Sequence, residues 1–328
     1  MRRVRRILVA VRNPSVKPSP AVLKSVQLGK AFGAEVELFH ALAAPVYFDA
    51  YSSLNDHTAE VERSTREDCL AKLDASAARL RHHGVSVSTA CDWDYPVHEA
   101  ILRRAAQSNA DLIVADLHAG RHIVPGLLQL SDWELLRLSP IPVLLVRKRG
   151  AYHKPTILAA VDPSHADAKP LQLDARILDI GQGFAKALKG SLHAVHAYLA
   201  IPPLALGASA LDPGTVDELE RQAAVRASRM MRHLLKQTKI PASRRHIVSS
   251  HPLLAIRDTA KETNSSIVVM GAISRSGIKR LLIGNTAESL LDRLSCDILI
   301  VKPQGFVGRV PRARRGARLV PVAQPVGM

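Results

Sequence analysis

The chain has 328 residues, a formal net charge of +16 and an apolar fraction of 47%. This length suits two domains of roughly 150 residues, each large enough to bury its own core. No apolar run approaches the roughly 18 residues of a membrane span, and three widely spaced cysteines without a CxxC pair indicate no disulfide framework. We therefore expect a cytoplasmic protein that does not insert into membranes.

The first half, residues 1–149, alternates between apolar strands and helices with an apolar stripe. Strands are predicted over residues 6–12, 35–42, 85–91, 111–116 and 141–147, and helices over residues 20–32, 56–83, 97–108 and 131–138. Ser131 is expected to cap the last of these helices. Strands that alternate with helices favour a parallel sheet covered on both faces.

The second half, residues 155–303, gives the same order of elements. Strands are predicted over residues 156–161, 191–198, 245–249, 266–271 and 297–302, and helices over residues 171–188, 213–237, 253–263 and 286–294. The fold class is therefore α/β, with two tandem doubly wound domains and five parallel strands in each.

The two halves also match in sequence. At a shift of 155 residues, four residues in or directly after one predicted helix meet identical residues in or directly after another; they are Ala100, Ile101, Ala105 and Asn109 against Ala255, Ile256, Ala260 and Asn264. Solenoid repeats are much shorter, about 20–50 residues, so this is a duplicated domain. Residues 304–328 show no periodicity and are rich in Gly, Pro and Arg, which predicts a disordered basic tail.

One segment of the second half has the composition of a phosphate-binding loop. Gly271 ends a predicted buried strand, and Gly284 stands just before a helix whose first turn holds Thr286; Asn285 and Thr286 can donate hydrogen bonds to a phosphate. Glycine lets the backbone approach a phosphate, and helix N-termini offer free N–H groups. Glycines also punctuate ordinary turns in α/β proteins, so the spacing alone leaves both interpretations open.

The same segment resembles the signature of the universal stress protein family, Gly-x-x-Gly, nine residues, then Gly-Ser/Thr. Gly271 and Gly284 match the first and third glycines. Ser274 replaces the second glycine, and residues 275–283 supply the nine-residue spacing. Asn285 stands in place of Ser/Thr, with Thr286 one residue later. The resemblance covers about residues 5–303, and the tandem arrangement is similar to members of the E type.

The resemblance implies a nucleotide site in the second half, with ATP or a related nucleotide as ligand and Mg²⁺ as its companion ion. Asp162, after the first strand of that half, matches an aspartate that the family places near the nucleoside. The implied site residues are Ala160, Asp162, Ala197, Met270, Gly271, Ser274, Gly284, Asn285 and Thr286. The loss of the second glycine at Ser274 weakens the case for tight triphosphate binding.

The first half departs from this pattern. Arg12 stands where the strand-end aspartate belongs, and Asp116 occupies the position of Gly271. A carboxylate there would repel a phosphate, so we expect the first domain to have lost the family's site. Arg12 and Arg121 with three histidines leave open a different anion site; the histidines are His40, His118 and His122.

No catalytic or metal-binding constellation emerges from the sequence, so we do not expect an enzyme. The resemblance implies a stress-response protein in which the second domain binds its ligand as a non-catalytic sensor. The resemblance implies that the two domains pair within the chain through residues 143–146 and 298–301, and it leaves a homodimer open. One alternative is a weak ATPase that depends on Asp162, and another is a scaffold that binds a lipid or a partner protein. Nucleic-acid binding by the arginine-rich ends is not favoured, because no aromatic residues are interleaved with the tail arginines.

Overall fold

The computed structural model describes residues 4–14, 17–49, 54–117, 130–164, 172–199, 213–272, 293–308 and 310–322. These residues form two compact units. The first unit takes its described residues from the stretches 4–151 and 307–322, and the second from the stretch 152–306. The family-like halves of the sequence therefore correspond to two separate folded bodies.

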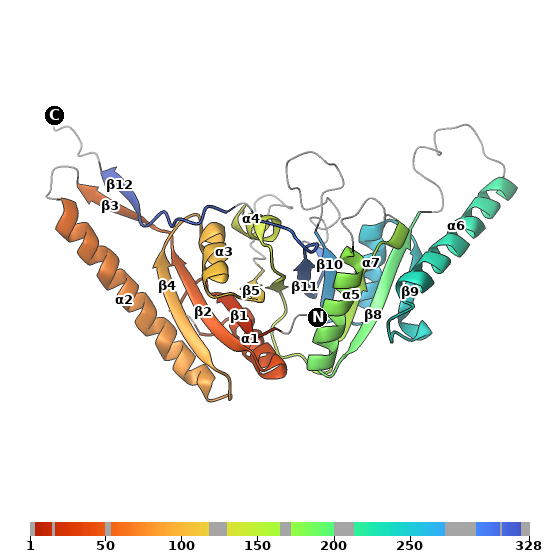
Figure 1. The fold of residues 1–328 in the computed structure, drawn as a ribbon, viewed down its shortest axis with the longest axis horizontal. Coiled ribbons are helices and arrows are strands. Elements are labelled where there is room, and N and C mark those ends of the chain that lie inside the picture. The colour runs from red at the N-terminus through yellow and green to blue at the C-terminus, as the bar shows by residue number, and fades with distance from the viewer. Residues whose placement is uncertain are drawn as a thin grey trace. The chain divides into compact units, whose positions relative to one another are not determined.

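The first unit contains a parallel sheet in the order β4-β2-β1-β5-β6 (Figure 1). Its strands are β1 (Arg6–Ala10), β2 (Glu35–Leu42), β4 (Val87–Trp93), β5 (Leu112–Asp116) and β6 (Val143–Val146), and its helices are α1 (Pro20–Phe32), α2 (Leu54–Arg81), α3 (Val97–Gln107) and α4 (Leu130–Leu138). The middle strands are buried along almost their whole length, as expected of a parallel sheet between two helical layers.

The second unit repeats this arrangement in the order β11-β10-β7-β8-β9. Its strands are β7 (Thr156–Ala160), β8 (Ser191–Tyr198), β9 (Arg245–Ser249), β10 (Ile267–Gly271) and β11 (Asp297–Val301), and its helices are α5 (Leu173–Ala187), α6 (Pro213–Leu234), the short η3 (Ala242–Arg244) and α7 (Pro252–Glu262). The predicted α/β class with five parallel strands in each half is confirmed.

Strand order fixes where a ligand is expected in each unit. In the first unit the chain runs from β1 outward to β2 and β4, and then returns to the other side of β1 with β5 and β6. Right-handed crossovers place α1 and α2 on one face and α3 and α4 on the other. The direction reverses between β1 and β5, and between β7 and β10 in the second unit, so the carboxyl ends of these pairs are the topological switch points.

Helix ends follow the local sequence. Helix α1 begins at Pro20, whose missing N–H suits the first helical position, and the Ser19 side chain accepts from the Val22 N–H at 3.4 Å. It ends at Gly33, which has a φ of 64°, a left-handed conformation that glycine adopts without strain. The expectation for Ser131 was wrong, because α4 already includes Leu130 and Ser131 therefore lies inside the helix.

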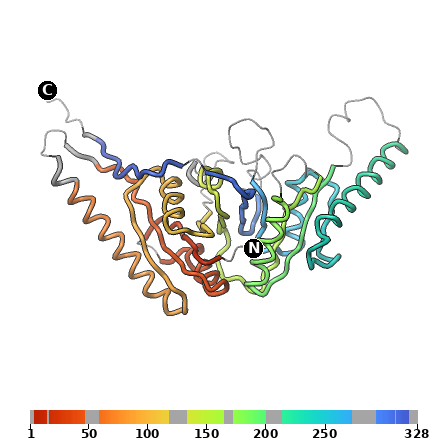
Figure 2. The backbone as a smooth tube through the Cα atoms, in the orientation of Figure 1, coloured from red at the N-terminus to blue at the C-terminus, as the bar shows by residue number. Residues whose placement is uncertain are grey.

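The prediction of a disordered tail after residue 304 is also wrong for the residues that the structure describes. Residues Arg318–Val322 form β12, which pairs in parallel with β3 (Pro45–Asp49) from Arg318↔Pro45 to Val322↔Asp49. Figure 2 shows that the chain leading to β12 passes α3 before it reaches β3. The sequence does not reveal this pairing, because the two strands lie near opposite ends of the chain.

Candidate functional site

The candidate site lies at the switch point of the second unit. Strands β7 and β10 are neighbours, with Ala159 opposite Val269 in the register. Asp162 follows the end of β7, and Gly271 is the last residue of β10. Two residues that the sequence places about 110 positions apart therefore come to adjacent strand ends.

The described site residues form an accessible rim on a buried sheet. Ala160, Asp162, Ala197 and Gly271 are partly exposed, whereas the strand residues before them are buried. Met270 is only 5% exposed and belongs to the core rather than to this rim. The remaining predicted residues, Ser274, Gly284, Asn285 and Thr286, lie outside the described part of the chain.

Asp162 is held in place from two sides. Its backbone N–H donates to Oδ1 of Asp174 in the first turn of α5, at 3.2 Å. Its own Oδ1 accepts from the Ser164 hydroxyl at 2.6 Å. The loop after β7 is thereby tied to α5, and the carboxylate of Asp162 stands at the rim with an orientation set by Ser164.

Gly271 has a packing reason to be glycine. A Cβ built at this position would lie 2.6 Å from Cδ2 of Leu173 and 3.3 Å from Cδ1 of Ile177, both on α5. The 2.6 Å approach is closer than real Cβ atoms come, so a side chain here would force the Leu173 side chain to shift and would disturb the packing of α5 on the sheet. The first glycine of the family-like motif thus lets α5 seat against β10, in addition to any approach by a ligand.

A buried lysine that the sequence interpretation missed stands beside this strand end. Lys302 directly follows β11, which pairs with β10, and it is 4% exposed. Its Nζ donates to the carbonyl oxygen of Ala272 at 3.2 Å and lies 5.0 Å from the Phe306 ring centroid. Its position directly after an apolar strand, at the ligand-binding edge of a parallel sheet, was the available signal. It places a positive charge next to Gly271.

The corresponding strand ends of the first unit carry different chemistry. Asp116, at the position of Gly271, accepts from the Ala21 N–H at 2.9 Å through Oδ1. That N–H belongs to the first turn of α1, so the carboxylate covers a helix N-terminus that an anion would otherwise use. This strand end of the first unit therefore differs in chemistry from that of the second unit, and the loss of the family's site in the first half stays a prediction.

The alternative anion site in the first unit gains no support from His40. Burial lowers the pKa of His40, and its hydrogen bond with the Val11 carbonyl oxygen at 2.7 Å offsets this only in part. His40 is thus held toward its neutral form and adds no positive charge beside Arg12. Arg121, His118 and His122 lie outside the described residues.

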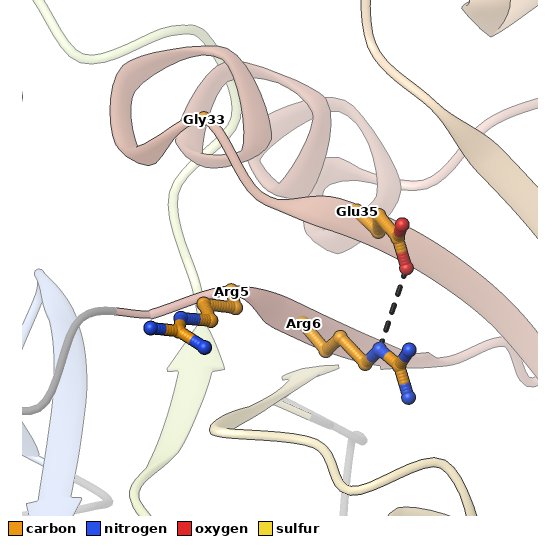
Figure 3. A pocket seen from close by; sticks show the side chains of 4 residues that line it. All are labelled: Arg5, Arg6, Gly33 and Glu35. Carbon is orange, nitrogen blue, oxygen red and sulfur yellow. Dashed lines mark ion pairs between the residues drawn. The ribbon is translucent and has the colours of Figure 1, made fainter.

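A surface pocket of about 390 Å³ lies at the opposite, amino edge of the first unit (Figure 3). It is lined by Arg5, Arg6, Gly33 and Glu35, and Nε of Arg6 lies 3.3 Å from Oε2 of Glu35. The Arg5 and Arg6 backbone N–H groups donate to Asp111 at 2.8 and 3.2 Å. These contacts anchor the start of β1. The pocket therefore lies at the amino ends of the strands, whereas the switch point of this unit lies at their carboxyl ends.

Comparison with known proteins agrees with the two-unit architecture. The model of the universal stress protein family matches residues 3–147 and 155–302. Universal stress protein E of Photorhabdus laumondii is 25% identical over 91% of this chain and 95% of its own length. A universal stress protein E homolog of Haemophilus influenzae is 27% identical over 90% of this chain and 97% of its own length.

Solved structures share this fold over most of the chain. A functionally unknown protein from Pseudomonas aeruginosa PAO1 is 26% identical, with a TM-score of 0.66 and coverage of 92% of this chain and 93% of that one. A universal stress protein from Archaeoglobus fulgidus shares the fold at 17% identity, with a TM-score of 0.57 and coverage of 90% of this chain and 96% of that one. In the part of the chain that the structure describes, no helix is long and apolar enough to cross a membrane.

Proposed function

We propose a nucleotide-sensing role in the stress response for this chain, which belongs to the universal stress protein family. Its two matched regions each correspond to one parallel α/β unit. The proposed ligand is ATP or a related nucleotide, bound by the second unit without being turned over. The first unit is proposed to have given up this activity.

The observation that carries the proposal is the contrast between equivalent strand ends. The second unit presents Asp162 and Gly271 at its switch point, whereas the first presents Arg12 and Asp116. The Asp162 carboxylate can accept hydrogen bonds from the hydroxyl groups of a ligand. The strand end at Gly271 has no side chain and therefore leaves room for that ligand. In the first unit the carboxylate of Asp116 is already bonded to the N-terminus of α1.

Each part of the proposed site has a chemical task. The Asp162 carboxylate, an acceptor with several lone pairs, would receive the ribose hydroxyl protons. Ala160 and Ala197, small and partly exposed, would leave room for the base. Gly284 and Thr286, with Ser274 and Asn285, would offer backbone and side-chain donors to the phosphates, and Lys302 would add positive charge nearby. Mg²⁺ would accompany the phosphates.

Calorimetric titration of the full-length chain with ATP and Mg²⁺ tests this proposal. The wild type is expected to bind, and Asp162→Ala and Gly284→Val are expected to weaken binding by at least tenfold. Asp217→Asn is the matched control, because it removes an exposed carboxylate of α6 that is not among the proposed site residues. Unchanged affinity in Asp162→Ala would remove the assigned role of that carboxylate.

Phosphate release measured in the same samples separates sensing from hydrolysis. The sensor role predicts binding without turnover. Magnesium-dependent turnover that disappears in Asp162→Ala would instead identify an ATPase. Absence of binding by any adenine nucleotide would contradict the nucleotide role and favour a scaffold for a lipid or a protein.

A further inference from the structure

The described C-terminal residues 310–322, here called the C-terminal strap, lie on the first unit through contacts at several places. A Cβ at Gly308, just before the strap, would lie 2.1 Å from the Leu138 carbonyl oxygen at the end of α4. Further on, the Pro311 carbonyl oxygen accepts from Nη1 of Arg103 on α3 at 3.1 Å. The strap ends as β12 beside β3. It therefore follows a defined path.

Beneath the strap lies an acidic cluster of Asp92, Asp94 and Glu99. Asp92 belongs to β4, Asp94 follows that strand, and Glu99 is in the first turn of α3. Asp94 is bonded to Nε and Nη2 of Arg103 at 2.6 and 2.8 Å, with side-chain exposures of 3% for Asp94 and 4% for Arg103. Glu99 accepts from Nη1 of Arg103 at 3.0 Å.

The acidic cluster carries more negative charge than its own unit neutralises. Arg103 pairs with Asp94 and Glu99, and Asp92 is the third carboxylate, so one guanidinium charge leaves the cluster with an excess of two negative charges. Arg104 of α3 is also close enough to Asp92 to interact electrostatically, but it is paired with Glu37 of β2. Burying carboxylates without neutralising their charge costs free energy of folding. Two further positive charges are therefore needed to neutralise the cluster.

Two adjacent arginines of the strap supply these charges. Nη1 of Arg314 lies 2.8 Å from Oδ1 of Asp92, and its Nη2 donates to Oε1 of Gln107 at 3.0 Å. The backbone N–H of Arg315 donates to Oδ1 of Asp94 at 3.0 Å. Nη2 of Arg315 lies 3.1 Å from both oxygens of Glu99.

These contacts recognise a peptide rather than a single charge. The site bonds to the backbone at residue 311 and again at residue 315, and it bonds to two consecutive guanidinium groups between α3 and β4. The Arg315 guanidinium also lies 5.8 Å from the centroid of the Tyr95 ring, within range of a cation–π contact. Lysine offers no comparable fork of donors.

We propose that the acidic cluster is a binding site for an arginine pair in an extended peptide, filled here by the chain's own strap and open to the strap of a second copy. The Arg314 and Arg315 side chains are 42% and 44% exposed, so water reaches these ion pairs and each is individually weak. The chain's own strap outcompetes the strap of a second copy, because covalent attachment gives it a high effective concentration at the site. Weakening the contacts of the chain's own strap therefore frees the acidic cluster for the same segment of another copy.

A labelled synthetic peptide of residues 307–322 tests this exchange on the full-length chain by fluorescence anisotropy. The wild type is expected to bind weakly, since its own strap competes. Arg314→Ala with Arg315→Ala leaves the acidic cluster intact, and this variant is expected to bind the peptide at least tenfold more tightly. Arg312→Ala is the matched control, because exposed Arg312 makes no ion pair with any residue in the described ranges.

Two further reagents separate recognition from general attraction between charges. Adding Asp92→Asn and Glu99→Gln to the double arginine variant is expected to abolish the gain, and a peptide with alanine at both arginines is expected not to bind. Equal affinity of the wild type and the arginine variant would overturn the proposal. Equal binding of the alanine peptide would overturn it as well.

A second measurement needs no change in the strap. Trypsin cleaves after arginine, and the strap contacts are expected to protect residues 314 and 315 in the wild-type chain. Asp92→Asn with Glu99→Gln is expected to accelerate cleavage there at least several-fold, while cleavage after exposed Arg81 at the end of α2 stays unchanged. Equal rates at residues 314 and 315 in both proteins would contradict a strap held by the acidic cluster.

Discussion

The Asp116 carboxylate accepts a hydrogen bond from the backbone N–H of Ala21 at 2.9 Å, which links the end of β5 to the first turn of α1. At the equivalent place in the second unit, Gly271 has no side chain and Leu173 of α5 packs against it. The same junction between strand and helix is therefore closed by a carboxylate in one unit and by apolar packing in the other.

Replacing Asp116 is expected to destabilise the first unit. Asp116→Ala removes an acceptor and a negative charge from a helix N-terminus, which costs about 1 kcal/mol. Asp116→Asn keeps an oxygen acceptor and is expected to lose less. Denaturant unfolding monitored by circular dichroism measures both, and equal stability of the alanine variant and wild type would show that Ala21 finds another partner.

A methyl group at Gly271 is expected to disturb the seat of α5. Gly271→Ala places its Cβ against Leu173, and overpacking of this kind costs about 1–3 kcal/mol. Adding Leu173→Ala makes room, so the double variant is expected to be more stable than the sum of the two single effects predicts. Strict additivity of the three unfolding free energies would contradict the packing role.

Much of the fold could be predicted from the sequence because local patterns carry it. The strand Ser191–Tyr198 was predicted with its observed bounds, since its apolar residues lie between clear helix and turn signals. Strands β3 and β12 were missed, because Pro45 and Pro321 read as breakers and the pairing joins opposite ends of the chain. No local sequence pattern predicts a strand pairing between the two ends of the chain.

Part of the candidate site could likewise be predicted from the sequence, and part of it could not. Asp162 and Gly271 were found by matching a motif, and the strand order explains why they meet. Lys302 and the hydrogen bond that Asp116 accepts from α1 were missed, because the first depends on which strand neighbours β10 and the second on where a helix begins. Both are tertiary facts that one-dimensional spacing does not contain.

The free energy of unfolding of the second unit is expected to fall above about pH 10, because Tyr152 keeps its proton in the folded chain. Its hydroxyl donates to Oδ2 of fully buried Asp297 at 2.6 Å, and burial followed by the Asp297 charge raises its pKa well above the usual value. The folded chain then keeps a proton that the unfolded chain loses above a pH of about 10. The free energy of unfolding should therefore fall as pH rises past that point, by up to about 1.4 kcal/mol per pH unit.

Tyr152→Phe provides the control for this pH effect. The variant is expected to be less stable at neutral pH by about 1–3 kcal/mol, since a buried carboxylate loses a donor. Its unfolding free energy should decline less steeply than that of the wild type above pH 10. Identical slopes in the two proteins would show that Tyr152 does not keep its proton in the folded state.

The paired histidines of β8 and β9 are expected to destabilise the second unit in mild acid. His193 Nδ1 and His246 Nε2 lie 3.0 Å apart, so one ring donates to the other and one must be neutral. Burial lowers the pKa of both, and the charge of His246 together with Arg244 lowers that of His193 further, while Glu262 opposes the shift at His246. Stability is therefore full above pH 6.5 and is lost as the pH falls through the depressed values.

His193→Gln with His246→Gln isolates this contribution, because His40 and His98 also have lowered pKa values and remain in both proteins. The wild type is expected to lose more unfolding free energy than the double variant between pH 6.5 and 5. Parallel curves would contradict the histidine pair as the source.

The central claim is that only the second unit binds a nucleotide, and binding stoichiometry tests it most directly. Calorimetric titration with ATP and Mg²⁺ is expected to give one site per wild-type chain. Asp162→Arg, which installs the residue found at the equivalent position in the first unit, is expected to remove that site, and Arg12→Ala is expected to leave it. Two sites per chain, or one site that survives Asp162→Arg and is lost in Arg12→Ala, would contradict the account.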